Sequence, residues 1–549
     1  MKKSKALALL PLVLALVFIM AACTSEADTT PDVAPPAPQQ EGQQTQDQPA
    51  PGDDLPPLTP LSVLVWDRGN PGGTDPTNNF YTDWIKEQVL NELNIEVSFI
   101  SINRFAETTE MVNLLAAGMA PDLAITFDGG MVNTFGRQGG ILNMAPLLDE
   151  HLPNLPYLES FFGDNLRLNQ DPQSGEIFSI LQVLTHHTRN NTYIRGDWLE
   201  ALDIPPPTTT EEFVDALRAF RDYNPGNVST VVPMAMTAAV RARANNLLES
   251  FIPFHSLTRQ EIFRYNVAQR YVLFPGYVEG ARLLNQMFNE GLLDPDFPLH
   301  TGDEQSDDMT ALGMVGAYIH NWDHVYRPHP GIQTRLQENV PGAFFIAIDP
   351  FTNPDTGQSQ KIVGTFSAHV FIPATSRNPE GALRYLNWMS RLENRRFLQI
   401  GEEGYTHQLV DGVVAMMHDE GERIMNSINN FDLTLVVNGI DLGSTEENIA
   451  SMSLNYPGVD PELVARAYYY ATRNIIGMPI IPVPGGLPAE DAFAPTFHEM
   501  IDELMAVAIT VPADQFDATW DSMMAGILQA GAQAAMDARW YGYMGQVAP

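Results

Sequence analysis

The amino-acid sequence predicts an α/β fold with mainly parallel sheets flanked by helices. From Leu61 onward, short apolar runs alternate with amphipathic segments in the order strand, helix, strand, helix, strand. That order favours a parallel sheet covered by helices on both faces. The chain has 549 residues, which is too long for one hydrophobic core, so two or three domains are expected.

The composition excludes several classes of protein. Hydrophobic residues make up 44% of the chain and charged residues 18%, which is typical of a soluble globular protein. Lysine and arginine number 30 against 67 acidic residues, and the net charge of -37 repels phosphate backbones, so no nucleic-acid partner is expected. Because the chain has a single cysteine, it cannot form an internal disulfide or a zinc cluster.

Residues 1–22 are predicted to be a lipoprotein signal peptide. A lysine-rich start precedes an apolar run from Ala6 to Ala22, the only stretch of the sequence suited to a bilayer. The single cysteine, Cys23, follows Met20-Ala21-Ala22 and resembles the lipidated cysteine of a bacterial lipobox. The resemblance implies a lipid anchor on the extracellular face of the cell membrane. The alternative is an ordinary signal peptide followed by an incidental cysteine.

Residues 23–60 are predicted to comprise the lipidated cysteine and a disordered linker. The segment is rich in Pro, Gln, Asp and Thr and has almost no large apolar residues. Such a segment buries too little surface to offset the entropy that ordering would cost. We expect it to act as a stalk between the membrane and a folded body.

Five elements are predicted at the start of the folded body. Trp84, Ile85, Val89 and Leu93 recur near helical spacing, whereas residues from Ile95 onward alternate with a period of two. The expected elements are a strand at Leu61–Trp66, a helix at Tyr81–Leu93, a strand at Ile95–Ile100, a helix at Glu107–Ala117 and a strand at Leu123–Phe127.

A second unit is predicted to begin near Tyr193. Thr209 and Glu212 have the spacing of a capping box, directly before an apolar helical face. Further elements are expected as a helix at Tyr277–Asn289, strands at Gly313–His320 and Lys361–Pro373, a helix from Asn378 to Leu392, and helices within Val459–Tyr470 and Glu490–Arg539.

Several segments together resemble the lipid-anchored extracellular solute-binding proteins of bacterial ABC importers, the maltose-binding-protein-like class (family 1 type). The similarity covers nearly all of Leu61–Gln546, and its segments occur in the order that the family has. They are Glu110–Leu123 with its Pro-Asp turn, Gly139–Leu148, Tyr193–Leu199 followed by Pro207–Thr209, and Gly313–Trp322.

The resemblance implies a two-lobed periplasmic-binding-protein-like fold (type 2) with a ligand cleft between the lobes. The chain would cross near Ile180–Asn191 and return near Gly364–Phe371. The expected division is 61–185 for the first part of lobe 1, 186–363 for the first part of lobe 2, 364–455 for the return to lobe 1, and 456–549 for C-terminal helices packing on lobe 2.

The predicted ligand-binding residues are aromatic and polar side chains at strand ends and in loops, because a sugar has apolar faces and hydroxyl edges. In the resemblance, a polar pair after the first strand holds sugar hydroxyls. The candidates are Trp66, Asp67, Arg68, Asp128, Tyr193, Arg195, Trp322, Asp323 and Tyr405.

Each candidate also has a structural alternative. Trp66 and Trp322 would suit a core, Asp128 would cap a turn, and Tyr193 with Arg195 would support the crossing between lobes. After removal of the signal peptide, only Lys86 and Lys361 remain as lysines, so a cationic contact in the site is expected to use arginine.

No metal or cofactor is expected. Some relatives carry a calcium loop where this chain has 222–229, but most of its carboxylates are replaced here. A second acidic cluster contains Asp303, Glu304, Asp307 and Asp308. It fits a solvated acidic loop better than a cation site.

The sequence therefore predicts a monomeric binding protein, not an enzyme. It would capture a small solute outside the cell, with an oligosaccharide favoured, and deliver it to the transmembrane subunits of an ABC permease. One alternative is a secreted carbohydrate-active enzyme with two carboxylates about 5–10 Å apart, although no catalytic motif stands out. Another is a ligand-sensing lipoprotein, which would share the fold and the cleft.

Overall fold

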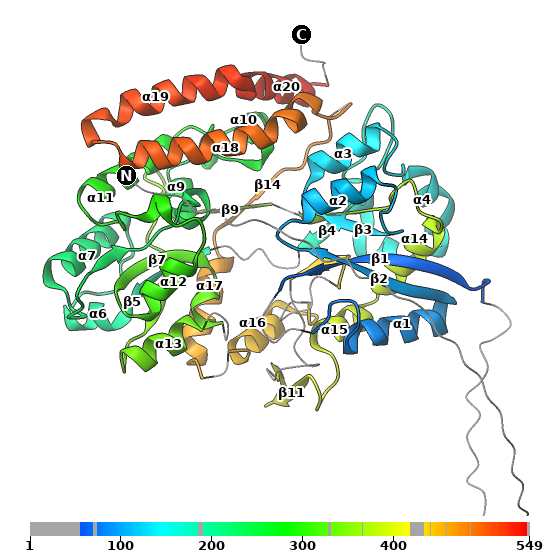
Figure 1. Ribbon diagram of the computed structural model, residues 1–549, viewed down its shortest axis with the longest axis horizontal. Helices are drawn as coiled ribbons and strands as arrows, with labels where there is room; N and C mark the ends of the chain where they lie inside the picture. The colour runs from blue at the N-terminus through cyan, green and yellow to red at the C-terminus, as the bar shows by residue number, and fades with distance from the viewer. Residues whose placement is uncertain are drawn as a thin grey trace, which may run out of the picture. The chain divides into compact units, whose positions relative to one another are not determined.

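The computed structural model describes residues 55–69, 74–184, 190–327, 331–364, 366–417, 433–439, 441–456, 458–483 and 485–545. All of them belong to one compact unit, Asp53–Pro549 (Figure 1). The predicted signal peptide, Cys23 and most of the predicted linker lie outside the described residues. No helix in the described part of the chain is both long and apolar enough to cross a membrane.

The first lobe contains two sheets. Strand β1 (Thr59–Asp67) pairs in parallel with β2 (Ile95–Asn103), with Thr59 opposite Ile95. A four-stranded sheet has the order β13-β4-β10-β3. Its strands are β3 (Ala124–Thr126), β4 (Ile180–Leu184), β10 (Phe366–Phe371) and β13 (Val437–Asn438).

Helices cover these sheets and complete a core that includes Leu61, Ile85, Leu123 and Trp388. Asn79 caps the first helix through a reciprocal capping box with Thr82, which satisfies donors at the helix start. The helices are α1 (Phe80–Leu93), α2 (Glu107–Ala116), α3 (Gly129–Arg137), α4 (Ala145–His151), α5 (Pro156–Phe162), α14 (Pro379–Met389) and α15 (Leu392–Ile400).

The second lobe is built on a sheet of order β6-β7-β5-β8. The strands are β5 (Asn190–Arg195), β6 (Val232–Met234), β7 (Val315–Asn321) and β8 (Phe345–Ile348). The helices are α6 (Gly196–Ala201), α7 (Thr210–Tyr223), α8 (Val240–Arg243), α9 (Asn245–Ser250), α10 (Arg259–Tyr265), α11 (Tyr277–Asn289), α12 (Glu304–Ala311) and α13 (Ile332–Asn339). The predicted capping box is present, with Thr209 accepting from the N–H of Glu212.

The last part of the chain adds helices to this second lobe. Buried residues of α18 and α19, including Met505 and Trp520, join the same core as α7 and α11. These elements are α16 (Thr445–Leu454), α17 (Pro461–Thr472), β14 (Ile475–Met478), α18 (Pro488–Thr510), α19 (Phe516–Ile527) and α20 (Gln533–Tyr543). A small hairpin of β11 (His407–Val410) and β12 (Val413–Met416) lies outside both sheets.

The sheets of the structure are mixed, so the prediction of mainly parallel sheets is wrong. In the first lobe, β10 runs antiparallel to both β3 and β4. In the second lobe, β5 runs antiparallel to β7 and β8. Both β5 and β10 adjoin the crossings between the lobes, where the chain enters a sheet from the opposite direction. The β-α-β pattern of the sequence reports only on neighbouring elements.

The single strand predicted at Lys361–Pro373 is two strands. Lys361–Gly364 forms β9, which pairs in parallel with β14, whereas Phe366–Phe371 forms β10 in the first-lobe sheet. The chain therefore passes between the lobes inside this apolar run. The helix predicted through Leu392 also ends sooner, at Met389, and Arg391 adopts an extended conformation before α15 begins.

A third cluster of buried residues joins the second-lobe sheet to the segment after β13. Tyr193 and Trp322 pack there with Leu442, Met452 and Tyr468. Leu442 and Met452 belong to the segment predicted as the return to the first lobe, so part of that segment packs on second-lobe residues.

Candidate functional site

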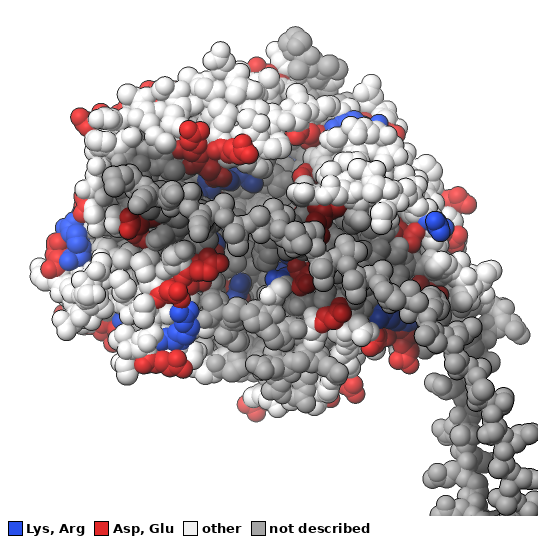
Figure 2. Space-filling model, in the orientation of Figure 1, with Lys and Arg blue, Asp and Glu red and all other residues white. Residues whose placement is uncertain are grey.

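A polar pocket of about 500 Å³ lies beside the chain crossings. Its lining includes Asn190, which begins β5, and Gly364, which ends β9. We call it the arginine pocket. It is lined by Asn190, Ala239, Arg241, Ala242, Arg243, Asn245, Glu249, Gln269, Arg270, Tyr271, Tyr277, Asn321, Gly364 and Asp502. In Figure 2, acidic side chains are spread over the face shown, while several basic atoms are set back within a hollow.

Short helices and a strained turn position the arginines. Arg241 and Arg243 lie on α8, and Arg270 follows a short 3-10 turn, η4 (Val267–Gln269). Within that turn Ala268 has φ 48 and Gln269 has φ 56, which are left-handed conformations that side chains other than glycine rarely adopt. The turn is held because the backbone N–H of Ala268 donates to Glu490 on α18 at 3.0 Å.

Two of the three arginines are neutralised by carboxylates. Arg241 donates from Nε and Nη2 to Asp502 at 2.7 and 3.0 Å. Arg243 makes the same two-pronged contact with Asp303, at 2.8 and 2.6 Å. Such bidentate pairs fix both the position and the plane of each guanidinium.

Arg270 has no carboxylate partner among the described residues. Its one hydrogen bond runs from Nη1 to the carbonyl of Gln269 at 3.2 Å, and its buried Nε has no acceptor within the described part of the chain. Burial, and then the charge of Arg241, lower the pKa of Arg270 to about 10. The guanidinium stays charged at neutral pH, and no carboxylate of the described residues forms an ion pair with it, although the charge of Asp502 acts on it.

Amides form another part of the lining. Asn190 donates from Nδ2 to the carbonyl of Ala242 at 2.7 Å and to Asn245 Oδ1 at 3.0 Å. Asn245 is 3% exposed, and its own Nδ2 has no acceptor among the described residues. Arg270 Nε and Asn245 Nδ2 are thus two buried donors that have no acceptor among the described residues.

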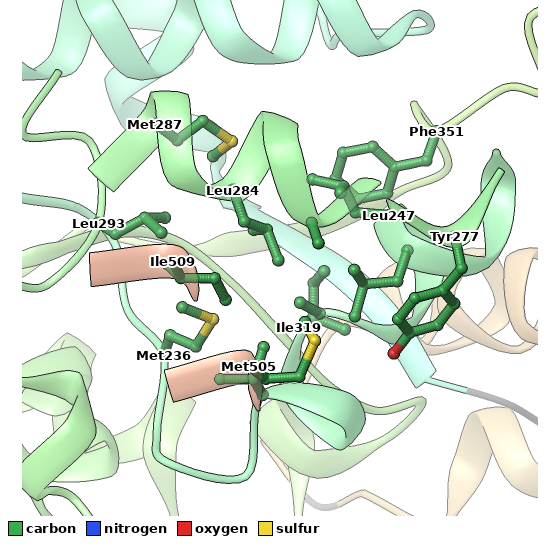
Figure 3. Close-up of a cluster of buried hydrophobic side chains, with 14 of the residues drawn as sticks. Met236, Leu247, Tyr277, Leu284, Met287, Leu293, Ile319, Phe351, Met505 and Ile509 are labelled. Carbon is green, nitrogen blue, oxygen red and sulfur yellow. The ribbon is translucent and has the colours of Figure 1, made fainter. Parts of the chain in front are cut away.

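The aromatic part of the pocket rests on the second-lobe core. Figure 3 shows Tyr277 at the edge of the apolar cluster formed by Leu247, Leu284 and Met505. Burial raises the pKa of the Tyr277 hydroxyl above its ordinary value, so it remains protonated. Tyr277 thus connects the pocket lining to the second-lobe core.

The first-lobe candidates gather at the ends of β1 and β3. The Trp66 ring stacks on Phe127 with centroids 5.1 Å apart and an interplanar angle of 19°. The Arg104 guanidinium lies over both rings, 4.6 Å from Trp66 and 4.4 Å from Phe127. Trp66 itself is buried, while Phe127 is 37% exposed. Phe127 thus presents partly exposed aromatic surface at this end of the lobe.

The polar candidates around this stack have local structural partners. Asp67 accepts from the backbone N–H of Gly69 at 2.8 Å. Asp128 caps α3 by accepting from the N–H of Met131 at 2.8 Å, which is the structural alternative that the sequence offered. Arg68 is partly exposed beside Asp67. Tyr405 packs against Phe80, with centroids 5.0 Å apart.

Tyr193 and Arg195 are fully buried in the second lobe. The Tyr193 hydroxyl donates to the backbone carbonyl of Trp322. Arg195 is 0% exposed, forms two hydrogen bonds with Asp197 at 2.8 and 2.7 Å, and lies over the Trp198 ring. In this conformation neither side chain has surface to offer a ligand, which favours their structural alternative.

Trp322 and Asp323 are also packed inside the protein. The Trp322 ring meets Tyr456 and Tyr468 edge to face, at 6.1 and 5.1 Å. Asp323 accepts from Arg327 at 2.6 Å and from the Tyr456 hydroxyl at 2.7 Å. Burial alone raises the pKa of Asp323, but Arg327 and Tyr456 outweigh it and hold the pKa below its ordinary value.

The acidic cluster from Asp303 to Asp308 is not the solvated loop that the sequence suggests. Glu304–Ala311 form α12, and three of the carboxylates are paired. Asp303 binds Arg243, Asp307 lies 2.9 Å from His324 Nε2, and Asp308 binds Arg335. The pattern of acids looked solvent-exposed because their basic partners come from distant parts of the sequence.

Within the described part of the chain, no three His, Cys, Asp or Glu side chains are grouped to hold a metal ion. In the segment that corresponds to the calcium loop of relatives, Asn224 closes the turn through two hydrogen bonds with the backbone of Val228, at 2.8 and 3.0 Å. Asp222 pairs with Arg221 instead of facing the loop.

The structure does not bring the nine predicted residues into one site, and none of them lines the arginine pocket. The residues that sequence reasoning missed are chiefly Arg241, Arg243, Asn245 and Arg270. One signal was present, because a chain with almost no lysine must use arginine for a cationic contact. The sequence gives no indication which arginines converge.

Comparison with known proteins gives distant relatives. No family model matches the chain. Lipoprotein LipO of Bacillus subtilis (strain 168) is 21% identical over 344 residues, which are 60% of this chain and 65% of LipO. An uncharacterized protein in the butB 5' region of Niallia circulans is 25% identical over 130 residues, 24% of this chain and 48% of that protein. The chain thus matches less than two thirds of the length of both relatives.

Solved structures match almost the whole folded part. The HMO-binding, ABC-transporter-associated solute-binding protein from Bifidobacterium longum infantis has a TM-score of 0.62 at 15% identity, over 89% of this chain and 99% of its own. The S. pneumoniae ABC-transporter substrate-binding protein FusA, in complex with kestose, has a TM-score of 0.63 at 14% identity, over 88% and 99%. The alginate-binding protein AlgQ2 has a TM-score of 0.60 at 16% identity, over 89% and 98%.

These three neighbours are binding proteins rather than enzymes by their names, in line with the absence of a catalytic motif in this sequence. Identities of 14–16% establish a shared fold. The resemblance found in the sequence is therefore confirmed at the level of the fold: the chain has the α/β fold of these ABC-transporter solute-binding proteins, and its sequence is distantly similar to that of lipoprotein LipO.

Proposed function

We propose that the protein captures an oligosaccharide outside the cell and delivers it to the transmembrane subunits of an ABC permease. The observation that carries this proposal is the fold, which matches binding proteins over 88–89% of this chain. The neighbours are named for human-milk-oligosaccharide binding, for a complex with kestose and for alginate binding. A saccharide is the solute class that these three share.

The two candidate surfaces suit a saccharide. The arginine pocket offers amide and guanidinium donors for hydroxyl oxygens, and Phe127 at the strand ends of the first lobe offers an apolar ring face. Asp67, Arg68 and Asp128 remain proposed ligand contacts at the same end of that lobe. The arginine pocket would bind the hydroxyl edges of a sugar, and Phe127 would cover its apolar face.

We also propose that the mature protein is a monomer held at the cell surface by a lipid on Cys23. The lipobox-like sequence and the distant relationship to a lipoprotein support this proposal. A lipid anchor keeps the binding protein close to a permease in the same membrane, which raises the effective concentration of each for the other.

Thermal unfolding of the mature chain with a panel of neutral and acidic oligosaccharides tests the proposal. A ligand that binds only the folded state, at 100 times its dissociation constant, adds about 2.7 kcal/mol to the free energy of unfolding. We expect at least one oligosaccharide to raise the unfolding temperature in a concentration-dependent manner. If no member does so while peptides or other solutes do, the ligand class is wrong.

A further inference from the structure

The arginine pocket has an unusual charge for this protein. The chain carries 67 acidic residues against 30 basic ones. Yet three arginines line this one pocket, against two acids, Glu249 and Asp502. Carboxylates of Asp502 and Asp303 pair with two of these arginines, so the third, Arg270, is the arginine that a ligand could engage.

The three guanidinium groups are not equivalent. Arg241 and Arg243 are held by Asp502 and Asp303, so their charges are balanced inside the protein. Arg270 forms no ion pair among the described residues, and its buried Nε–H lacks an acceptor. An arginine presents five N–H donors in a planar fork that matches the two oxygens of a carboxylate.

A second unpartnered group also belongs to the lining of the pocket. Asn245 is almost completely buried, and its Nδ2 has no acceptor among the described residues. Buried polar groups are nearly always hydrogen-bonded, so a donor left without a partner points to an acceptor that the ligand supplies. Arg270 Nε and Asn245 Nδ2 are both donors, so the matching ligand groups are oxygen acceptors.

The size of the pocket argues against a simple inorganic anion. A volume of about 500 Å³ lies in the range of sites for small organic ligands. Tyr271 and Tyr277 contribute ring surface, and Asn190 and Asn321 contribute amides. A sugar ring that bears a carboxylate would use all of these groups, whereas an isolated anion would use only the arginine.

We infer that the arginine pocket binds an acidic saccharide, with the carboxylate of a uronic acid unit on Arg270 and oxygens of the same ligand on Asn245. The inference rests on the proposed function, since it specifies the class of oligosaccharide. Arg241 and Arg243 are held in place by their paired aspartates and leave Arg270 as the charged contact.

Titration calorimetry on the mature chain tests the inference. The probes are trisaccharides of galacturonate, of glucuronate and of mannuronate, each compared with its methyl ester, which has the same skeleton without the charge. Neutral oligosaccharides of glucose and of fructose complete the panel. We expect one acidic trisaccharide to bind at least about tenfold more tightly than its ester, with an affinity that falls as salt is added.

Variants of Arg270 test whether this residue binds the carboxylate of the ligand. Arg270→Gln should lower the affinity for the acidic trisaccharide at least about tenfold and change the affinity for its ester less than twofold. Arg270→Lys keeps the charge but loses the fork, so it should recover part of the loss. Arg218→Gln is the matched control, because Arg218 lies on α7, is exposed and pairs with Asp215 and Glu290 away from the pocket. Its affinity should equal that of the parent chain.

The outcomes separate the two proposals. If acidic trisaccharides and their esters bind equally, or if Arg270→Gln binds the acid as the parent does, the inference is overturned while the proposed function stands. The same holds if only neutral oligosaccharides bind. If no saccharide of either kind binds the folded parent chain, both proposals are overturned. Circular dichroism of each variant establishes that a lost affinity is not a lost fold.

Discussion

Single residues in the arginine pocket show how neighbours decide the role of a side chain. Arg241 and Arg270 line the same space, but only Arg241 has a carboxylate, at 2.7 Å. The pKa of Arg270 falls to about 10 because of burial and then of Arg241. Removing Arg241 would leave the half-exposed Asp502 without its partner, whereas removing Arg270 leaves no carboxylate unpaired. Arg270 is therefore the residue whose replacement tests binding rather than folding.

Trp322→Ala should destabilise the protein. The Trp322 side chain is 7% exposed and packs between Tyr456 and Tyr468, so its removal leaves a cavity in the third apolar cluster. Truncating a buried tryptophan costs about 3–5 kcal/mol. Urea unfolding followed by tryptophan fluorescence measures the change.

Phe127→Ala is the matched comparison from the first lobe. Because Phe127 is 37% exposed, we expect its loss to cost about 1 kcal/mol or less, chiefly from the stack on Trp66. If Trp322→Ala were as stable as Phe127→Ala, the packed position of Trp322 would be wrong, and the sequence-based prediction of a ligand-stacking role would regain support.

His320 should make the protein sensitive to acid. Its Nδ1 accepts from the backbone N–H of Asn321 at 2.8 Å, and its Nε2 lies 3.2 Å from Asp303, so the folded protein holds the neutral ring. Burial is the main reason that its pKa falls to about 3, and the nearby charges of His324 and Arg243 act in the same direction. In the unfolded chain the ring titrates near its ordinary pKa.

The difference between the folded and unfolded pKa of His320 decides how the free energy of unfolding changes with pH. Between about pH 6.5 and pH 3 the unfolded state binds one more proton, so stability falls as the pH falls, by up to about 1.4 kcal/mol per pH unit. His320→Gln should flatten this dependence, as measured by urea unfolding from pH 7 to pH 4. His255→Gln, at an exposed position, is the control and should leave the slope unchanged. A slope in His320→Gln equal to that of the parent would contradict the prediction.

Helices and strands with strong local signals could be predicted from the sequence. The helix at Tyr277–Asn289 has the predicted bounds, and the capping box at Thr209 and Glu212 is present. Errors arise where a non-local partner decides the outcome. The run Lys361–Pro373 is uniformly strand-like, but β9 pairs with β14 more than 100 residues later, and β10 pairs with β3 and β4. Local pattern contains no information about that change of partner.

Asn285 should anchor α18 to α11. Its Nδ2 donates to the carbonyls of Ala508, Ile509 and Val511, at 3.0, 3.0 and 2.7 Å, which are orphan acceptors at the end of a helix. Asn285→Ala leaves these buried carbonyls without the side-chain donor and should cost about 1–3 kcal/mol.

Asn285→Asp should cost more, because a carboxylate would face carbonyl oxygens instead of donating to them. Asn289→Ala is the control on the same helix, since Asn289 makes its bond to Val511 at an exposed position. Thermal unfolding of the three variants should rank them as Asn289→Ala, Asn285→Ala and Asn285→Asp in order of decreasing stability. Any other order would show that the contact does not hold the helices together.

On the scale of the whole molecule, the predicted lobes explain why the fold was easier to predict than the site. Five segments spread over more than 200 residues identified the family resemblance, because each lobe has a recognisable order of elements. The arginine pocket instead joins residues from Asn190 to Asp502, which come from five helices or turns and three strand ends. Only the folded chain shows which of these residues converge. The local pattern of the sequence instead favours aromatic residues near strand ends as ligand contacts.

Cys23→Ser should release the protein from the membrane or leave its signal peptide uncut. The prediction rests on the position of the single cysteine directly after Met20-Ala21-Ala22. Fractionation of cells that express the parent and the variant measures the anchored share, and mass spectrometry of the parent detects the lipid. If the processed variant remained on the membrane as the parent does, lipidation would not be the anchor.

Ligand binding should close the two lobes about the predicted crossings near Ile180–Asn191 and Gly364–Phe371. A ligand shifts an open–closed equilibrium only as far as it binds one state better, so it must touch both lobes. The arginine pocket supplies contacts beside the second-lobe sheet, and the Trp66–Phe127 stack supplies them at the first-lobe strand ends. Arg137 on α3 also binds Asp491 on α18, so closure must accommodate this ion pair.

Small-angle scattering should show a smaller radius of gyration at saturating ligand. Arg270→Gln at the same ligand concentration should stay open, whereas an unchanged radius in the saturated parent would mean that the protein binds without closing.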